Sequence, residues 1–201
     1  MSNSFVSLQN VSLAYGKTVA VSNLDLNVRK GELIALLGPS GCGKTTTMRA
    51  IAGLMSLHSG SISIDGVDMS RTPANKRGIG LVFQSYALFP HLNAFENVAF
   101  GLRIKKFSTP EITTRVDRGL TMVGLSHLAE RKPEEMSGGQ QQRLSLARSL
   151  VMEPKVLLLD EPLSNLDARL RLEMRTELQR VQRDTGITMI FVTHDQSEAL
   201  A

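Results

Sequence analysis

Hydrophobic residues follow two strand-like patterns along the chain. Residues 24–28 alternate apolar and polar positions, and residues 61–64 do the same before the turn signal Asp65-Gly66. Such alternation is typical of half-buried strands. Three other runs are wholly apolar, at residues 33–37, 156–159 and 189–192. Runs of this kind favour strands that are buried on both faces of a mostly parallel sheet.

Helical spacing separates these predicted strands. Leu170, Met174, Leu178 and Val181 fall at intervals of four, four and three residues, which places them on one face of a helix that Gly186 can end. Strands that alternate with helices predict an α/β fold with right-handed crossovers. The stretch from about residue 90 to 135 has three prolines, many charges and no buried-strand run, so we expect a mostly helical insert there.

Composition narrows the class of protein. The 201 residues are 42% hydrophobic and 21% charged, with one cysteine and a net charge of +4. This balance is that of a globular domain with a core, and it excludes a disulfide scaffold. No apolar run reaches the roughly 20 residues of a spanning helix, and residues 1–4 show no signal-peptide pattern, so a cytoplasmic location is expected. The basic residues are scattered and aromatics are only 4%, which predicts no nucleic-acid binding.

A glycine-rich loop follows the first apolar run. Residues 38–45, Gly38-Pro39-Ser40-Gly41-Cys42-Gly43-Lys44-Thr45, fit G-x-x-x-x-G-K-[ST] before a predicted helix over 46–52 that opens at Thr46. The glycines let backbone N–H groups wrap a polyphosphate, and the helix N-terminus adds positive potential. Lys44 can reach the outer phosphates and Thr45 can ligate Mg²⁺. The alternative is an ordinary turn before a helix, but the flanking strand and helix favour nucleotide binding.

Two carboxylates, Asp160 and Glu161, follow the apolar run 156–159. Ligands of open α/β sheets bind at this end of the strands. Asp160 is therefore a candidate for the metal and Glu161 for the base that takes a proton from attacking water. Alone, the pair would more simply be solvated loop residues or helix caps. The presence of a phosphate loop in the same chain favours the functional interpretation.

A second candidate anion site is Ser137-Gly138-Gly139-Gln140, ahead of a helical pattern over 141–152. Ser137 and Gln140 also fit a capping box, so the motif could be no more than a well-capped helix. The two glycines leave backbone N–H groups open to an anion. One chain then carries two phosphate-binding helix starts.

Taken in order, these motifs resemble the ATP-binding subunit of an ATP-binding-cassette (ABC) transporter. Residues 38–45 resemble its Walker A, the strand ending at Asp160-Glu161 its Walker B, and residues 136–140 its signature sequence, with Met136 where Leu is usual. The resemblance gives roles to four more residues. Tyr15 matches the adenine-stacking aromatic, Gln84 the Q-loop glutamine near metal and γ-phosphate, Asp167 the D-loop aspartate and His194 the switch histidine. Alone, each has a structural alternative: a strand end for Tyr15 and Gln84, an N-cap for Asp167 and a structural histidine for His194.

The resemblance implies a single ABC ATPase domain over residues 1–201. It implies a P-loop NTPase core with a mostly parallel sheet and an N-terminal antiparallel β-subdomain, over about 1–89 and 156–201. A helical subdomain with the signature would occupy about 90–155. ATP and Mg²⁺ are the implied cofactors. Two such subunits would pair head to tail, so that the phosphate loop of one faces Ser137–Gln140 of the other.

The implied function is hydrolysis of ATP to power solute import. Residues 161–167 and 193–196 look most like importer ATPases, which work at the cytoplasmic face of the inner (plasma) membrane with permease subunits and, indirectly, a solute-binding protein. Family members continue beyond the point that matches Ala201, so a truncated chain is expected. The alternative is a soluble ABC ATPase of DNA repair or translation, but no sustained heptads lie between Lys44 and Asp160. A P-loop kinase would lack the Ser137–Gln140 element.

Overall fold

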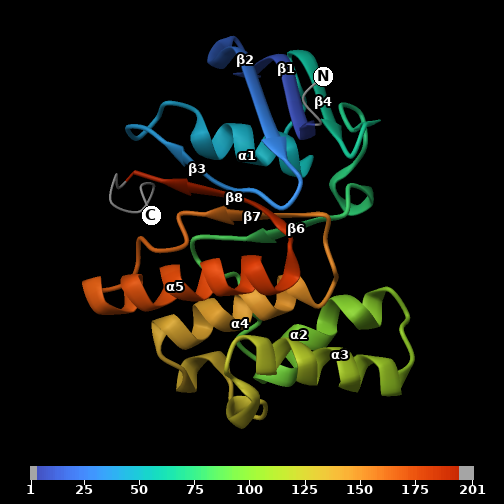
Figure 1. The fold of residues 1–201 in the computed structure, drawn as a ribbon, viewed down its shortest axis with the longest axis vertical. Coiled ribbons are helices and arrows are strands. Elements are labelled where there is room, and N and C mark those ends of the chain that lie inside the picture. The colour runs from blue at the N-terminus through green and yellow to red at the C-terminus, as the bar shows by residue number, and fades with distance from the viewer. Residues whose placement is uncertain (1–3, 195–201) are drawn as a thin grey trace.

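The computed structural model describes residues 4–194 as two sheets and their covering helices (Figure 1). The antiparallel strands are β1 (Ser4–Tyr15), β2 (Thr18–Arg29), β4 (Ser59–Ile64) and β5 (Val67–Asp68). The parallel strands are β3 (Leu33–Leu37), β6 (Ile79–Val82), β7 (Val156–Asp160) and β8 (Thr188–Thr193). The α-helices are α1 (Lys44–Ala52), α2 (Ala94–Ile104), α3 (Thr109–Met122), α4 (Gly138–Leu150) and α5 (Ala168–Thr185). Short 3₁₀ turns occur at Ala74–Lys76, Ser126–Leu128 and Pro133–Glu135.

The parallel sheet has the strand order β3-β8-β7-β6. Its register pairs Leu33 with Met189 and Val156 with Thr188, so the four strands run together and end at one edge. The three wholly apolar runs predicted β3, β7 and β8, and the last two of these are buried almost throughout. The loops that leave this edge carry the predicted chemical motifs.

The antiparallel sheet has the order β2-β1-β4-β5 and forms a separate layer. Helix α1 lies between the two sheets, while α2 to α5 lie on the other side of the parallel sheet (Figure 1). Because side chains alternate along a strand, β7 serves both layers. Leu158 joins the core with β1 and α1, whereas Leu157 and Leu159 join the core with the helices. The predicted P-loop core, antiparallel β-subdomain and helical insert are confirmed.

Two helices begin earlier than the sequence pattern predicts. Helix α1 starts at Lys44 rather than Thr46, and α4 starts at Gly138 rather than Gln141 and ends at Leu150 rather than Met152. The glycines of the second motif form the first turn themselves, because Ser137 caps it. The subdomain boundaries near residues 90 and 155 stay a prediction. Within residues 4–194 no helix combines the length and apolar character needed to cross a bilayer.

Candidate nucleotide-binding site

The phosphate loop connects β3 to the start of α1. Gly41 and Gly43 adopt left-handed φ angles of 83° and 94°. A Cβ at Gly43 would lie 2.4 Å from Cγ2 of Val21 on β2, so no other residue fits without a shift. Gly43 is the N-cap of α1 and gives it no side-chain cap. This arrangement, the first helix start, therefore leaves backbone N–H groups for an anion.

Lys44 folds back over this loop. Its Nζ donates to the carbonyl oxygens of Gly38 at 2.6 Å and Pro39 at 2.8 Å, and it lies 3.6 Å from Sγ of Cys42. An ammonium group has three donors on a flexible stem, so it can exchange these carbonyls for phosphate oxygens. The loop thus holds its cation at the place where a phosphate would bind.

Thr45 and Asp160 meet beneath the loop. The Thr45 hydroxyl donates to Oδ1 of Asp160 at 3.1 Å. Burial raises the pKa of the Asp160 carboxyl; the Thr45 hydrogen bond opposes this effect and the nearby Glu161 charge adds to it. A hydroxyl and a carboxylate are the hard oxygen ligands that Mg²⁺ prefers. The pair therefore fits the metal predicted for it, and a cation there would offset the cost of the buried charge.

The three predicted catalytic residues gather at the ends of adjacent strands. Gln84 follows β6, and its Nε2 donates to Oε2 of Glu161 at 3.0 Å. Nδ1 of His194, just after β8, lies 3.9 Å from the same carboxylate oxygen. Gln84 was also predicted to ligate the metal. Within residues 4–194 its amide group hydrogen-bonds to Glu161 and Ser164 rather than to Thr45 or Asp160, so that role stays a prediction.

Sequence reasoning missed two polar residues of this cluster, Ser164 and Asn165. Oγ of Ser164 accepts from Gln84 Nε2 at 3.1 Å and donates to the Glu161 carbonyl at 3.0 Å. Nδ2 of Asn165 donates to the Gln84 carbonyl at 3.1 Å. They hold the loop after Glu161 against the loop after β6. Their place in the motif Ser164–Asp167 was the available signal, but nothing in it indicates their partners.

The second helix start, Ser137–Gln140, opens α4. Oγ of Ser137 accepts from the Gln140 N–H at 3.3 Å, and Oε1 of Gln140 accepts from the Ser137 N–H at 2.9 Å, which completes the predicted capping box. A Cβ at Gly138 would meet only Leu166, at 4.0 Å, so the space beside the glycine is open. No hydrogen bond within residues 4–194 joins this start to the phosphate loop.

Tyr15 and Asp167 occupy their predicted places with different outcomes. Tyr15 ends β1, is 52% exposed, and belongs to the hairpin whose return strand covers Gly43 through Ala20 and Val21. The ring is accessible to a ligand, and its stacking on adenine stays a prediction. Oδ1 of Asp167 accepts from the Leu170 N–H at 2.9 Å, so Asp167 is the N-cap of α5. Its role across a subunit interface stays a prediction.

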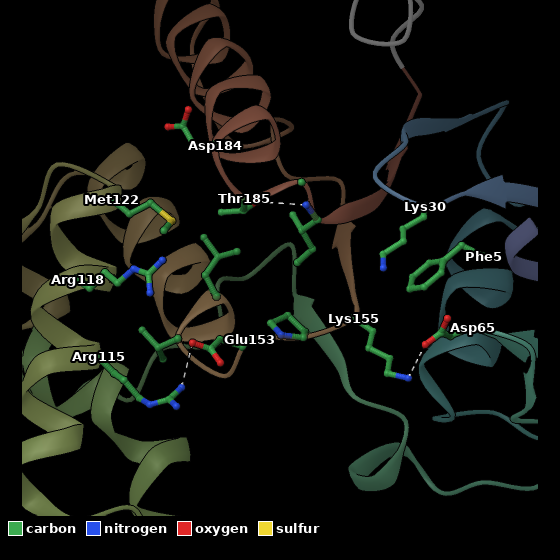
Figure 2. Close-up of a pocket in the computed structure, with 16 residues that line it drawn as sticks. Phe5, Lys30, Asp65, Arg115, Arg118, Met122, Glu153, Lys155, Asp184 and Thr185 are labelled. Carbon is green, nitrogen blue, oxygen red and sulfur yellow. Dashed lines mark hydrogen bonds and ion pairs between the residues drawn. The ribbon is translucent and has the colours of Figure 1, made fainter.

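A cavity of about 560 Å³ lies at the opposite edge of the parallel sheet. Figure 2 shows its two walls, with ion pairs between Arg115 and Glu153 at 3.2 Å and between Lys155 and Asp65 at 3.0 Å. None of the predicted site residues lines it. The motifs instead lie at the other edge, where β6 leads to Gln84, β8 to His194, and β7 to both Asp160 and Glu161.

A buried parallel strand, a glycine-rich loop that begins a helix, and a carboxylate pair at the end of another strand of the same sheet define a P-loop nucleotide-binding domain. Residues 21–164 match the ABC transporter family, and the chain belongs to that family.

Similar proteins agree with this placement. The chain is 54% identical over 97% of its length to the spermidine/putrescine import ATP-binding protein PotA of Haemophilus influenzae. It is 55% identical over 98% of its length to the Fe(3+) ions import ATP-binding protein FbpC of Brucella abortus. It covers 52% and 56% of these two proteins, so the chain spans about half the length of the curated relatives it matches.

Two solved structures share the fold at 35% sequence identity. The structure of cbiO1 from Clostridium perfringens, part of the ABC transporter complex cbiONQ, superposes with a TM-score of 0.89 over 96% of this chain and 80% of that one. A dimeric ATP-binding cassette in a post-hydrolysis state bound to ADP and Pi gives 0.84 over 96% and 90%.

Proposed function

We propose that the chain is the ATP-binding and ATP-hydrolysing part of an ABC importer. The observation that carries the proposal is the convergence of Gln84, Glu161 and His194 beside the phosphate loop. Three separate strands end at this cluster, so that Gln84 and His194 both lie against the Glu161 carboxylate, which is the arrangement that hydrolysis of a bound phosphate requires. Relatives named as import ATP-binding proteins support the importer reading.

Each residue then has a defined task. Lys44 and the loop N–H groups bind the phosphates, and Tyr15 stacks on the adenine. Thr45 and Asp160 hold Mg²⁺, which neutralises phosphate charge when bound. Glu161 takes a proton from the attacking water, and Gln84 and His194 orient the water and the γ-phosphate. Gln84 already donates a hydrogen bond to Glu161. A displacement of the Gln84 loop would therefore change the surroundings of the proposed catalytic carboxylate.

Two copies complete each site. In the described part of the chain, residues 4–194, the two helix starts have no hydrogen bond between them, yet both are suited to phosphate. Head-to-tail pairing would set the first start of one copy against Ser137–Gln140 of the other, with ATP between them and Asp167 crossing the interface. The dimeric neighbour bound to ADP and Pi supports the pairing of two copies.

A permease is the proposed membrane partner. Exposed apolar side chains occur shortly before the loop over residues 86–90, at Phe83 (40% exposed), and on α2, at Phe100 (38%) and Ile104 (67%). Phe89 packs on Phe100 with ring centroids 4.4 Å apart. Exposed apolar side chains of this kind suit docking of an apolar partner segment. The partner would place the protein at the cytoplasmic face of the membrane, with a solute-binding protein acting through the permease.

The test is coupled hydrolysis. The full-length protein is co-expressed with its candidate permease subunits, purified, and assayed for ATP turnover in lipid vesicles with and without the solute-binding protein and solute. Stimulated turnover that Lys44→Ala abolishes is the expected result. ATP hydrolysis without co-purification of any permease, and with stimulation by DNA or ribosomes, would instead indicate the soluble alternative.

A further inference from the structure

The backbone after Gln84 takes an unusual path. Tyr86 and Ala87 are consecutive residues with positive φ angles, 61° and 47°. Residues other than glycine rarely adopt the left-handed region, and two in succession persist only where the surroundings hold them. Something in the fold must therefore fix this segment.

Helix α4 supplies the restraint. Nη2 of Arg148 donates to the Tyr86 carbonyl at 3.0 Å, and Nη1 donates to the Ala87 carbonyl at 2.6 Å. Oγ of Ser145 donates to the same Tyr86 carbonyl at 2.9 Å. Both left-handed residues are thus held through their carbonyl oxygens by side chains one helical turn apart.

The environment of Arg148 suits this task and little else. Within residues 4–194 its hydrogen bonds go to backbone oxygens only, and its guanidinium lies 5.7 Å from the centre of the Phe89 ring. Burial lowers its pKa. A partly buried cation without a carboxylate partner is costly to keep, and a planar fork that reaches two successive carbonyls is what arginine offers over lysine.

We propose that Arg148 is a positioning residue that clamps the loop after Gln84 to helix α4. The first turn of α4 is the second helix start, and Gln84 hydrogen-bonds to Glu161. The clamp therefore makes the Gln84 loop and the second helix start move as one body, so that displacement of one displaces the other. The consequence for turnover rests on the proposed function.

The test compares four variants of the full-length protein: Arg148→Gln, Arg148→Lys, Ser145→Ala and the double variant Arg148→Gln with Ala87→Gly. Arg148→Gln should lower kcat for MgATP at least tenfold and leave nucleotide affinity within about twofold, because the clamp does not touch the phosphate loop. Arg148→Lys and Ser145→Ala keep part of the restraint and should fall between it and the parent.

Glycine supplies the decisive arm. It adopts positive φ at no steric cost, so Ala87→Gly should restore at least a third of the turnover that Arg148→Gln loses. Lys106→Gly is the matched control, since Lys106 has φ 60° but lies outside the loop, and it should restore nothing. Arg118→Gln, an exposed arginine of α3, should leave turnover unchanged.

Hydrogen exchange separates the inference from the proposed function. The Tyr86 N–H donates to the Phe83 carbonyl at 2.9 Å, and Arg148→Gln should speed its exchange at least tenfold even if the parent hydrolyses no ATP. A parent without turnover would contradict the proposed function alone. Unchanged kcat and exchange in Arg148→Gln, or equal rescue by Ala87→Gly and Lys106→Gly, would overturn the clamp.

Discussion

The two helix starts of this chain prepare for an anion in different ways. The first is capped by a left-handed glycine without a capping side chain, and its lysine rests on the carbonyls of its own loop. The second is closed by a reciprocal capping box between Ser137 and Gln140, with no acidic residue and no cation in its first turn. Lys44 must therefore leave these carbonyls when the first start binds a phosphate, whereas the second start is already held by its capping box.

This difference indicates a division of labour. A start with a mobile cation and open N–H groups can bind a nucleotide by itself, because charge and donors come from one chain. A rigid start without a cation offers fixed donors, which contribute most where charge develops during reaction. We expect the first start to govern affinity and the second to govern turnover.

The largest effect should come from Glu161→Gln. This variant should bind ATP without hydrolysing it, so that binding at the two helix starts can be compared. Loss of the proposed general base should slow hydrolysis by roughly two to four decades, while binding at the first start persists. Single-turnover hydrolysis and nucleotide titration measure the two quantities. Glu173→Gln, on the exposed face of α5, is the matched control. Equal turnover in Glu161→Gln and parent would remove Glu161 from this role.

Much of this site could be predicted from sequence because the motifs are local. Residues 38–45 contain the glycines that the loop needs. The apolar runs before Gly38 and Asp160 predict the two strands that bring the phosphate loop and the carboxylates together. The contacts of Ser145, Arg148, Ser164 and Asn165 could not be predicted in that way. Each joins segments far apart in the chain through a single hydrogen-bonding group, and no spacing rule reveals such a pair.

Backbone strain was equally invisible in the sequence. Glycine marks a left-handed position by its identity, as Gly43 does, but Tyr86 and Glu161 adopt positive φ without any such mark. Their conformations follow from tertiary restraints that overrule local preference. The sequence therefore indicated which loops meet, and the structure shows how they are held.

Lys44→Ala tests the expectation that the first helix start governs nucleotide affinity. Loss of a charge-assisted phosphate contact is worth about 1.5–3 kcal/mol, so the nucleotide dissociation constant should rise roughly 10- to 150-fold. A fluorescent-ATP titration measures it. Lys105→Ala, beyond the end of α2, controls for the lost charge. The same dissociation constant for Lys44→Ala and parent would show that the first start does not depend on its cation.

Alanine at each helix start should have opposite effects on stability. At Gly43 the new Cβ would meet Val21 at 2.4 Å in a left-handed backbone, which should cost about 1–3 kcal/mol and reduce ATP binding. At Gly139 the nearest atom, Cδ2 of Leu170, is 3.5 Å away, and alanine should stabilise the helix by up to about 1 kcal/mol.

Thermal melting and nucleotide titration of both glycine variants decide this point. Gly139→Ala should keep parental affinity, because its methyl group would face Leu170 and not the phosphate loop. Gly138→Ala places the methyl group in open space at the start of α4, where it would cover donors that the proposed dimer turns toward a second ATP, so it should lower turnover about tenfold or more. If Gly139→Ala instead weakens binding to the isolated subunit, both starts serve the same nucleotide and the proposed division of labour is wrong.

The smallest effect concerns the stability that the fold loses by burying the Asp160 carboxylate beside the first start. Burial raises the folded-state pKa of Asp160 above its ordinary value of 3.8, so the folded protein holds this proton more tightly than the unfolded chain. The unfolding free energy of the protein therefore falls as pH rises from about 3.8 through the raised pKa of Asp160, and it stays lower above that pKa.

Asp160→Asn removes this effect while keeping an oxygen near Thr45. Without Mg²⁺ and nucleotide, the variant should melt roughly 1–3 °C above the parent at neutral pH, and the difference should shrink toward pH 4. Saturating MgATP should reverse the order, because only the parent gains stability from the bound metal. Equal melting temperatures of variant and parent at every pH without ligand would show that the charge of Asp160 does not destabilise the fold.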